Sequence, residues 1–251
     1  MKQVKLTVIN NGTVADNVVR TVLEGDVSAI TKPGQFINLR VGNNFLRRPI
    51  SVYDVDTANH TVTVLYKIVG KGTEQMASWK QGEETDVLTG LGNGFDISKA
   101  GDAPLLIGGG IGSAPMMMLA RCLIEDGVRP TVVLGFNTAG EIILREDLYD
   151  LGCDVFVATA DGSFGYKGFV TGLVEDPSAL GIEYSYFYAC GPSPMLHAVY
   201  KATRGEGELS FEERMGCGFG ACMGCSIQTR NGSRRVCKDG PVFLKSDLLW
   251  E

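Results

Sequence analysis

The chain has 251 residues, of which 44% are apolar and 21% charged, so it can bury a hydrophobic core without disulfide cross-links and is not intrinsically disordered. Its 23 Lys and Arg residues stand against 29 Asp and Glu residues, a net charge of −6. This acidic balance argues against nucleic acid or an anionic membrane as the main partner.

Residues 1–10 alternate between polar and apolar side chains as a strand does, so we expect no secretory signal and a cytoplasmic location. Residues 103–120 carry no charged side chain and reach the length of a transmembrane helix. Their glycines and prolines would break such a helix, so we expect a buried strand, a glycine turn and a buried helix in a soluble protein.

Residues 1–99 have the pattern of a β-sandwich or β-barrel. Turn residues recur about every eight to twelve positions and separate short segments that alternate between apolar and polar side chains. These segments lie at residues 4–9, 35–41, 49–55, 61–69 and 85–88, with a helical stretch at residues 73–79.

Residues 102–204 have the pattern of an α/β domain. Strand-like runs at residues 105–107, 131–136, 154–159 and 186–190 alternate with helical patterns at residues 115–125, 146–151 and 194–202. This alternation predicts βαβ units and a parallel sheet covered on both faces. From about residue 208 the chain is rich in Cys and Gly and too short for a core of its own.

The sequence GGGIGSAP at residues 108–115 joins a predicted strand to a predicted helix. Bare backbone before a helix lets a pyrophosphate approach, and the helix dipole favours the anion, so this turn predicts a dinucleotide site. A purely structural turn is the alternative. No Arg or Lys follows the next strand at Asn137 to meet a 2′-phosphate, although Glu141 is close, and this favours NAD over NADP.

Four of the seven cysteines fall close together, spaced Cys217-x4-Cys222-x2-Cys225-x11-Cys237. An odd number of cysteines with one tight cluster argues against a disulfide framework and for a reduced compartment with a metal site. The x4-x2 spacing followed by a distant cysteine is that of plant-type [2Fe–2S] clusters. Structural zinc and unligated thiols are the alternatives.

Three further segments suit anions or redox chemistry. Arg47 and Arg48 begin a predicted strand, and their guanidinium groups suit phosphate, although a solvated strand edge is the alternative. Gly72 and Thr73 open the predicted helix as an anion site or as a plain helix cap. Cys190 ends a strand where ligands bind in such sheets, or it is a buried inert thiol.

Together these segments resemble the ferredoxin–NADP reductase superfamily and, within it, the electron-transfer subunits of class 1B dihydroorotate dehydrogenase. The motifs that carry the resemblance span nearly the whole chain. They are RPISV at residues 48–52, LGNGF at 91–95, GGGIGSAP at 108–115, ACGP at 189–192, the cysteine cluster, and RVCKDGPVF at 235–243.

The resemblance implies a mixed β and α/β fold of three domains: an antiparallel β-barrel that binds FAD at residues 1–99, a Rossmann-like parallel-sheet domain that binds NAD at 100–207, and a small [2Fe–2S] domain at 208–251. It also implies the site residues. FAD would contact Arg48, Pro49, Ile50, Ser51, Leu65, Tyr66, Lys67, Gly72 and Thr73; NAD would contact Gly110, Gly112, Ser113 and Pro115, with the catalytic Cys190 near the nicotinamide; the cluster ligands would be Cys217, Cys222, Cys225 and Cys237.

The function implied by the resemblance is electron transfer in pyrimidine biosynthesis. An FMN-containing catalytic subunit oxidises dihydroorotate, and electrons pass through the cluster and FAD to NAD⁺, in a heterotetramer with two copies of each subunit. Because NAD takes two electrons as a hydride and the cluster passes one at a time, the flavin belongs between them. We expect this chain alone to oxidise NADH with artificial acceptors but not to oxidise dihydroorotate.

Two alternatives stay open. A reductase module of the same architecture could serve another redox partner, such as a hydrogenase, a sulfite reductase or a sulfide dehydrogenase; a neighbouring gene for an FMN-containing dehydrogenase would argue against it. A non-catalytic protein of this fold, stabilised by zinc or responsive to NAD, would be colourless when purified, whereas a flavin and a cluster give a brown-yellow colour.

Overall fold

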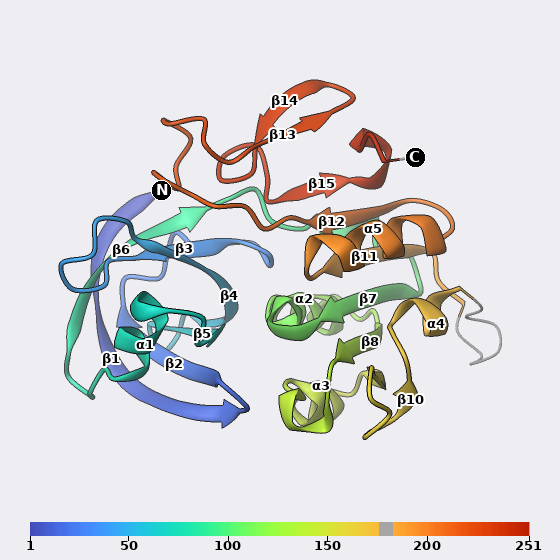
Figure 1. Ribbon diagram of the computed structural model, residues 1–251, viewed down its shortest axis with the longest axis horizontal. Helices are drawn as coiled ribbons and strands as arrows, with labels where there is room; N and C mark the ends of the chain where they lie inside the picture. Colours follow the sequence, from blue (N-terminus) through green and yellow to red (C-terminus); the bar gives the residue numbers. More distant parts are fainter. Residues whose placement is uncertain (176–182, 251) are drawn as a thin grey trace.

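The N-terminal part of the chain closes into a six-stranded barrel in which all neighbouring strands are antiparallel (Figure 1). The computed structural model describes residues 1–175 and 183–250. The barrel order is β1-β2-β5-β4-β3-β6. Its elements are β1 (Lys2–Ala15), β2 (Val18–Gly25), β3 (Phe36–Leu39), β4 (Arg48–Asp56), β5 (Thr61–Lys67), helix α1 (Lys71–Ala77) and β6 (Glu84–Leu91).

Alternate side chains of these strands fill the barrel, as the two-residue period of a strand requires, and Leu6, Leu23 and Ile37 are fully buried there. The sequence predicted every strand of the barrel except β2. The inward face of β2 includes Thr21, which is completely buried and contacts the Tyr66 hydroxyl. This polar residue interrupts the apolar alternation by which a half-buried strand is recognised.

A seven-stranded sheet follows in the order β10-β9-β8-β7-β11-β12-β15, parallel except between β12 and β15. The predicted parallel sheet is therefore confirmed. Its strands are β7 (Pro104–Gly109), β8 (Thr131–Phe136), β9 (Asp154–Thr159), β10 (Tyr166–Lys167), β11 (Tyr186–Cys190), β12 (Gly207–Ser210) and β15 (Val242–Leu244).

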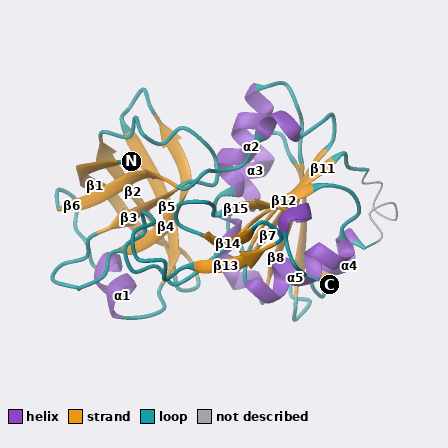
Figure 2. Cartoon of the chain, turned by 90° about the horizontal axis from the view of Figure 1, so that it is seen from above, coloured by secondary structure: helices purple, strands orange, loops and turns teal. Residues whose placement is uncertain are grey.

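Helices cover both faces of this sheet: α2 (Met116–Glu125) and α3 (Arg145–Asp150) lie on one side, and α4 (Thr171–Val174) and α5 (Ser193–Ala202) lie on the other (Figure 2). Leu106 packs in the same core cluster as Leu119 of α2. Its neighbour Ile107 packs in the cluster that contains Leu196 of α5. Because β7 is buried on both faces, its sequence is a continuous apolar run.

The C-terminal part of the chain is joined to the edge of the same sheet. A hairpin of β13 (Ser226–Thr229) and β14 (Gly232–Arg235) precedes β15, and β15 pairs with β12. The sequence predicted none of these strands, because they are short and the residues of β14 are mostly exposed. Phe211 packs against the rings of Phe243 and Trp250 and fixes this part beside the sheet.

Within residues 1–175 and 183–250, no helix is long and apolar enough to cross a membrane. The uncharged residues 103–120 form β7, a turn and the first half of α2, as predicted. Met116 and Met118 of this helix are buried in the core.

Candidate functional site

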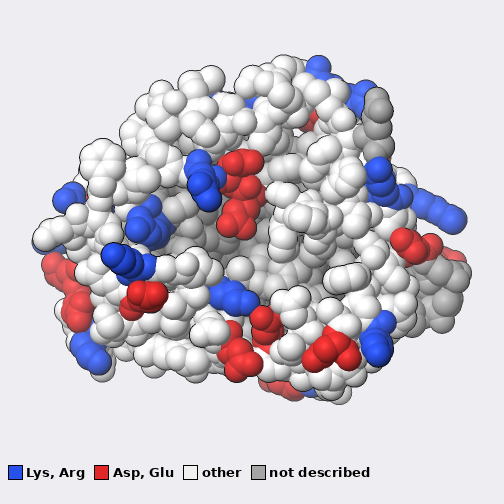
Figure 3. Space-filling view, viewed as in Figure 1, with Lys and Arg blue, Asp and Glu red and all other residues white. Residues whose placement is uncertain are grey.

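Figure 3 shows a hollow between the barrel and the sheet, with basic side chains on its barrel side and acidic side chains along one edge. Its two walls are the barrel on one side and the sheet with its helices and loops on the other, and two ion pairs join these two parts of the chain. Arg121 of α2 donates to Asp54 of β4 at 2.6 Å, and Lys67 of β5 donates to Glu141 at 2.8 Å. Each ion pair therefore connects the barrel to the part of the chain that forms the sheet.

Arg48 begins β4, and its guanidinium group lies against the backbone of Gly72 in α1. A Cβ atom at Gly72 would displace the Arg48 guanidinium group from this position, so glycine allows the close approach. Among the described residues Arg48 has no carboxylate partner, whereas the neighbouring Arg47 is paired with Asp86. An unpaired guanidinium beside bare backbone suits a pyrophosphate, so the two arginines have different roles.

Thr73 shapes the loop that precedes α1. Its hydroxyl oxygen accepts the backbone N–H groups of Val69 at 2.9 Å and Gly70 at 3.2 Å, and it donates to the Gly70 carbonyl at 2.9 Å. The hydroxyl is therefore engaged within the loop, and the backbone of Gly72 and Thr73 is the part that can contact a ligand.

Successive residues of β5 face different parts of the molecule. Leu65 packs into the core between barrel and sheet. Tyr66 points into the barrel, where its hydroxyl lies 3.3 Å from Thr21 Oγ1. Lys67 reaches across to Glu141. Of the flavin contacts expected on this strand, Tyr66 can thus offer only its backbone.

An apolar pocket of about 420 Å³ opens at the carboxyl ends of β7, β8 and β11, where ligands bind in parallel sheets. None of the described residues that line it is charged, which suits NAD rather than a dinucleotide with a 2′-phosphate. The lining residues are Gly109, Gly110, Gly135, Phe136, Asn137, Gly168, Phe169, Val170, Thr171, Pro192, Pro194, Met195 and Ala198.

The glycine turn predicted to bind the dinucleotide borders this apolar pocket. Ser113 is buried and donates to the Gly110 carbonyl at 2.6 Å, and Pro115 directly precedes α2. A Cβ atom at Gly112 would lie 2.6 Å from Gly191 Cα, so glycine is needed where this turn meets the loop after β11. These contacts fix the shape of the turn, and its glycines leave the backbone free of side chains that would block a ligand.

Cys190 ends β11 beside this loop and lies opposite Ser210 of β12. Burial raises the pKa of the Cys190 thiol to about 12, and the hydrogen bond with Ser210 opposes this only in part. The thiol is therefore neutral at physiological pH. It can pack against a ligand, but it is no nucleophile.

The four clustered cysteines form two pairs. Cys217 and Cys222 lie within hydrogen-bonding reach of each other in the loop between β12 and β13. Cys225 and Cys237 flank the β13–β14 hairpin, and the Cys237 N–H donates to Cys225 Sγ at 3.4 Å. Cys222 is exposed and the second pair is buried, so the site reaches the surface on one side.

The donor set distinguishes the two candidate metals. Among the described residues, no three His, Cys, Asp or Glu side chains surround one metal position. A Cys₄ zinc site would place all four thiolates on one ion, whereas a [2Fe–2S] cluster takes two on each iron, and the pairing of Cys217 with Cys222 and of Cys225 with Cys237 suits the cluster. Although burial raises it, hydrogen bonds from the backbone N–H groups of Phe219, Cys222 and Ala221 lower the pKa of Cys217 to about 6, which favours the ligating thiolate.

Asn38 connects this cysteine loop to the barrel. Its Nδ2 donates to the Cys217 carbonyl at 3.3 Å, and it lies opposite Pro49 of β4, next to Ile50 and Ser51. It is almost completely buried, and its Oδ1 has no partner among the described residues. Sequence reasoning missed Asn38, although an amide within the apolar residues 36–39 was a visible sign.

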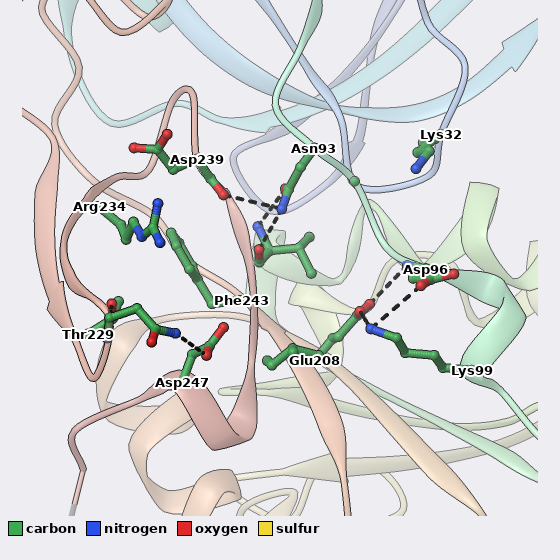
Figure 4. Close-up of a pocket in the computed structure, with 14 residues that line it drawn as sticks. Lys32, Asn93, Asp96, Lys99, Glu208, Thr229, Arg234, Asp239, Phe243 and Asp247 are labelled. Carbon is green, nitrogen blue, oxygen red and sulfur yellow. Dashed lines mark hydrogen bonds and ion pairs between the residues drawn. The ribbon is translucent and has the colours of Figure 1, made fainter.

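A second, polar pocket of about 380 Å³ lies where barrel, sheet and hairpin meet (Figure 4). The buried Glu208 carboxylate of β12 accepts the Asp96 N–H at 2.9 Å and lies 3.5 Å from Lys99 Nζ. On the hairpin side, Asn231 donates to Asp247 at 2.8 Å. Asp96, Lys99 and Glu208 pair with one another here, and Asn93 donates to the Val242 carbonyl at 2.8 Å, so contacts around this polar pocket join the three parts of the molecule.

Two family models match the chain. The model described as the iron–sulfur cluster binding domain of dihydroorotate dehydrogenase B matches residues 212–249, which include all four clustered cysteines. The model described as the oxidoreductase NAD-binding domain matches residues 106–201, which include the glycine turn.

Relatives match over the full length. The electron transfer subunit of dihydroorotate dehydrogenase B (NAD(+)) from Shouchella clausii (strain KSM-K16) is 42% identical over 261 residues, covering 99% of this chain and 98% of that protein. The subunit of the same name from Fusobacterium nucleatum is 39% identical, with 99% of each chain covered. The solved structure of an NADH-dependent reduced ferredoxin–NADP oxidoreductase is 28% identical with a TM-score of 0.89, covering 98% of this chain and 90% of that one.

Proposed function

Because the chain belongs to the family of electron transfer subunits of dihydroorotate dehydrogenase B, we propose that it carries electrons from a dihydroorotate-oxidising partner to NAD⁺ in pyrimidine biosynthesis. The observation that carries the proposal is the placement of the sites. The cysteine loop contacts β3 through Asn38, β3 pairs with β4, which begins at Arg48, and the apolar pocket lies at the carboxyl ends of β7, β8 and β11.

When bound, FAD exchanges hydride with NAD(H) and single electrons with a [2Fe–2S] cluster. In this proposal Arg48 and the backbone at Gly72 hold the FAD pyrophosphate, while the glycine turn admits the pyrophosphate of NAD to the start of α2. The neutral Cys190 thiol packs at the nicotinamide end. In this proposal FAD also contacts Pro49, Ile50, Ser51, Leu65, Lys67 and the backbone of Tyr66 and Thr73. The ligands of the cluster are Cys217, Cys222, Cys225 and Cys237.

The proposed partner is a catalytic subunit that contains FMN, and the proposed complex is a cytoplasmic heterotetramer with two copies of each subunit. The name "electron transfer subunit" of the relatives supports a partner. So does the exposure of Phe219 and Met223 beside Cys222, because a protein must approach the cluster to deliver electrons. We propose residues 1–99, 100–207 and 208–251 as the FAD, NAD and cluster domains.

The test is to purify the chain anaerobically with whatever accompanies it from its host, add dihydroorotate and follow the flavin absorbance. Bleaching that NAD⁺ reverses would support substrate, partner and electron path together. Bleaching by NADH but not by dihydroorotate would mean a different redox partner, such as a hydrogenase or a sulfite reductase. A colourless protein would mean a zinc-stabilised binding protein and would overturn the proposal.

A further inference from the structure

Glu141 connects the two walls of the hollow through its two carboxylate oxygens. Oε1 accepts from Lys67 Nζ at 2.8 Å, and Oε2 accepts from Asn137 Nδ2 at 2.8 Å and from the Asn137 backbone N–H at 3.2 Å. Lys67 ends β5 in the barrel, whereas Asn137 follows β8 and lines the apolar pocket. One side chain thus bridges the proposed flavin strand and the wall of the proposed NAD pocket.

The loop that carries Glu141 is also clamped to the barrel through its backbone. The short helix η3 (Ala139–Glu141) offers the Gly140 carbonyl to the Asp16 N–H at 3.0 Å. The ion pair itself is partly shielded, since the side chains of Lys67 and Glu141 are 35% and 19% exposed. Hydrogen bonding to Lys67, above all, holds the pKa of Glu141 below its usual range, so the bridge carries a charge at neutral pH.

This geometry differs from the usual task of an acid in this part of a nucleotide fold, because three hydrogen bonds from the protein already engage the Glu141 carboxylate. Such an acid accepts hydrogen bonds from the ribose hydroxyls of NAD. Both oxygens of Glu141 are already engaged, by Lys67 on one side and by Asn137 on the other. Its partners belong to the protein, one on each side of the hollow.

We infer that Glu141 is a positioning residue for hydride exchange, which sets the spacing between the apolar pocket at Asn137 and the flavin strand at Lys67. The inference rests on the proposed function, because it assumes that NADH and FAD occupy these two walls. Hydride transfer needs reacting atoms about 3–3.5 Å apart, and a displacement of about 1 Å can cost roughly 100-fold in rate. A bridge that fixes both walls therefore acts on the rate more than on binding.

The direct test is Glu141→Gln. Lys67 Nζ and the Asn137 backbone N–H can only donate, and glutamine has one accepting oxygen where glutamate has two, so the NH₂ group of glutamine must face one of these donors. We expect flavin reduction at saturating NADH to slow by about tenfold. The KM for NADH should change less than this rate, and the FAD content should stay that of the wild type. An unchanged rate would overturn the inference.

The matched control is Asp54→Asn, which breaks the other ion pair between the two walls. Arg121 and Asp54 are similarly shielded, at 26% and 28% exposed, but neither has a hydrogen bond to a residue that lines the apolar pocket, whereas Glu141 accepts from Asn137. Asp54→Asn should lower Tm and leave the rate of flavin reduction unchanged. Equal slowing by both variants would mean that any loss of packing between the walls suffices, and it would overturn a specific role for Glu141.

Lys67→Met provides a second route, because it cuts the same bridge from the barrel side. Combined with Glu141→Gln it should slow flavin reduction by no more than the slower single variant, since residues in one network are not additive. Additive losses would contradict a shared bridge.

If NADH fails to bleach the wild-type flavin, the proposed function itself fails; if the wild type bleaches and Glu141→Gln matches it, only this inference fails.

Discussion

Arg235 and Asp239 form an ion pair across the turn that carries Cys237, with 3.1 Å between Arg235 Nε and Asp239 Oδ2. Arg235 Nη1 also donates to the Gly220 carbonyl at 2.7 Å. Gly220 lies between Cys217 and Cys222, so one guanidinium group connects the loop of the exposed cysteine pair to the turn of the buried one.

Replacement of Arg235 by Met should therefore release iron while leaving the flavin in place. The two cysteine pairs would lose their connection, and a two-iron cluster needs both. The iron-to-FAD ratio of the purified protein measures the effect. Arg234→Met is the control, because Arg234 is exposed and has no ion pair among the described residues. Full iron content in Arg235→Met would contradict this role.

Arg48 and Arg47 should respond differently to the same substitution. Arg48→Met should weaken FAD binding by roughly 10–100-fold, because a hydrogen bond to a charged group contributes about 1.5–3 kcal/mol. Arg47→Met removes the ion pair with Asp86 and should lower Tm instead. Flavin fluorescence on dilution and thermal unfolding separate the two effects. Equal loss of flavin from both variants would show that the two arginines share one role.

Phe169 should contribute to NADH binding. It lines the apolar pocket, yet 72% of its surface is exposed. Aromatic packing contributes about 0.5–1.5 kcal/mol beyond area burial, so Phe169→Ala should raise the KM for NADH by about 2–10-fold with kcat little changed. Phe45→Ala is the control, since Phe45 is 99% exposed but does not line this pocket. An unchanged KM in Phe169→Ala would exclude this contact.

The free energy of unfolding of the protein should depend on pH through Glu208, which lines the polar pocket. Burial raises the pKa of this carboxyl, so the folded protein binds its proton more tightly than the unfolded chain does. Its contribution to the free energy of unfolding is complete below the unfolded-state pKa of about 4.3 and is lost as pH rises through the raised value. Glu208→Gln should abolish this decline.

Urea unfolding of both proteins across that window measures the effect. The stability of Glu208→Gln relative to the wild type should increase as pH rises above about 4.3 and then level off. A difference that is independent of pH would mean that Glu208 titrates in the folded state as it does in the unfolded chain.

The elements that local patterns encode were predictable. The run from β7 through the glycine turn to α2 follows from uninterrupted apolar residues and a cluster of glycines. The cysteine spacing alone indicated the cluster, and the structure adds that the cysteines lie in two pairs. The flavin residues depended on family motifs. The structure shows that the side chains of two of these residues point in different directions: Tyr66 points into the barrel, and Lys67 reaches across to Glu141.

The contacts that organise the site could not be predicted from one sequence. Asn38 and Cys217 are 179 residues apart, and Lys67 and Glu141 are 74 apart. Periodicity and propensity act over a turn or a strand and do not record which distant segments meet. Glu141 was visible only as an acid near a strand end. Its role as a bridge depends on how the barrel docks against the sheet.

The pairing of β15 with β12 limits where this chain can be truncated. β15 follows the last cysteine and occupies the edge of the sheet. A chain cut after residue 212 would lose the cluster. It would also leave the backbone N–H and C=O groups on one side of β12 unpaired, and an unpaired strand edge promotes aggregation. A version that lacks the cluster but does not aggregate should therefore come from point substitutions at cysteine, with the C-terminal strand retained to cover β12.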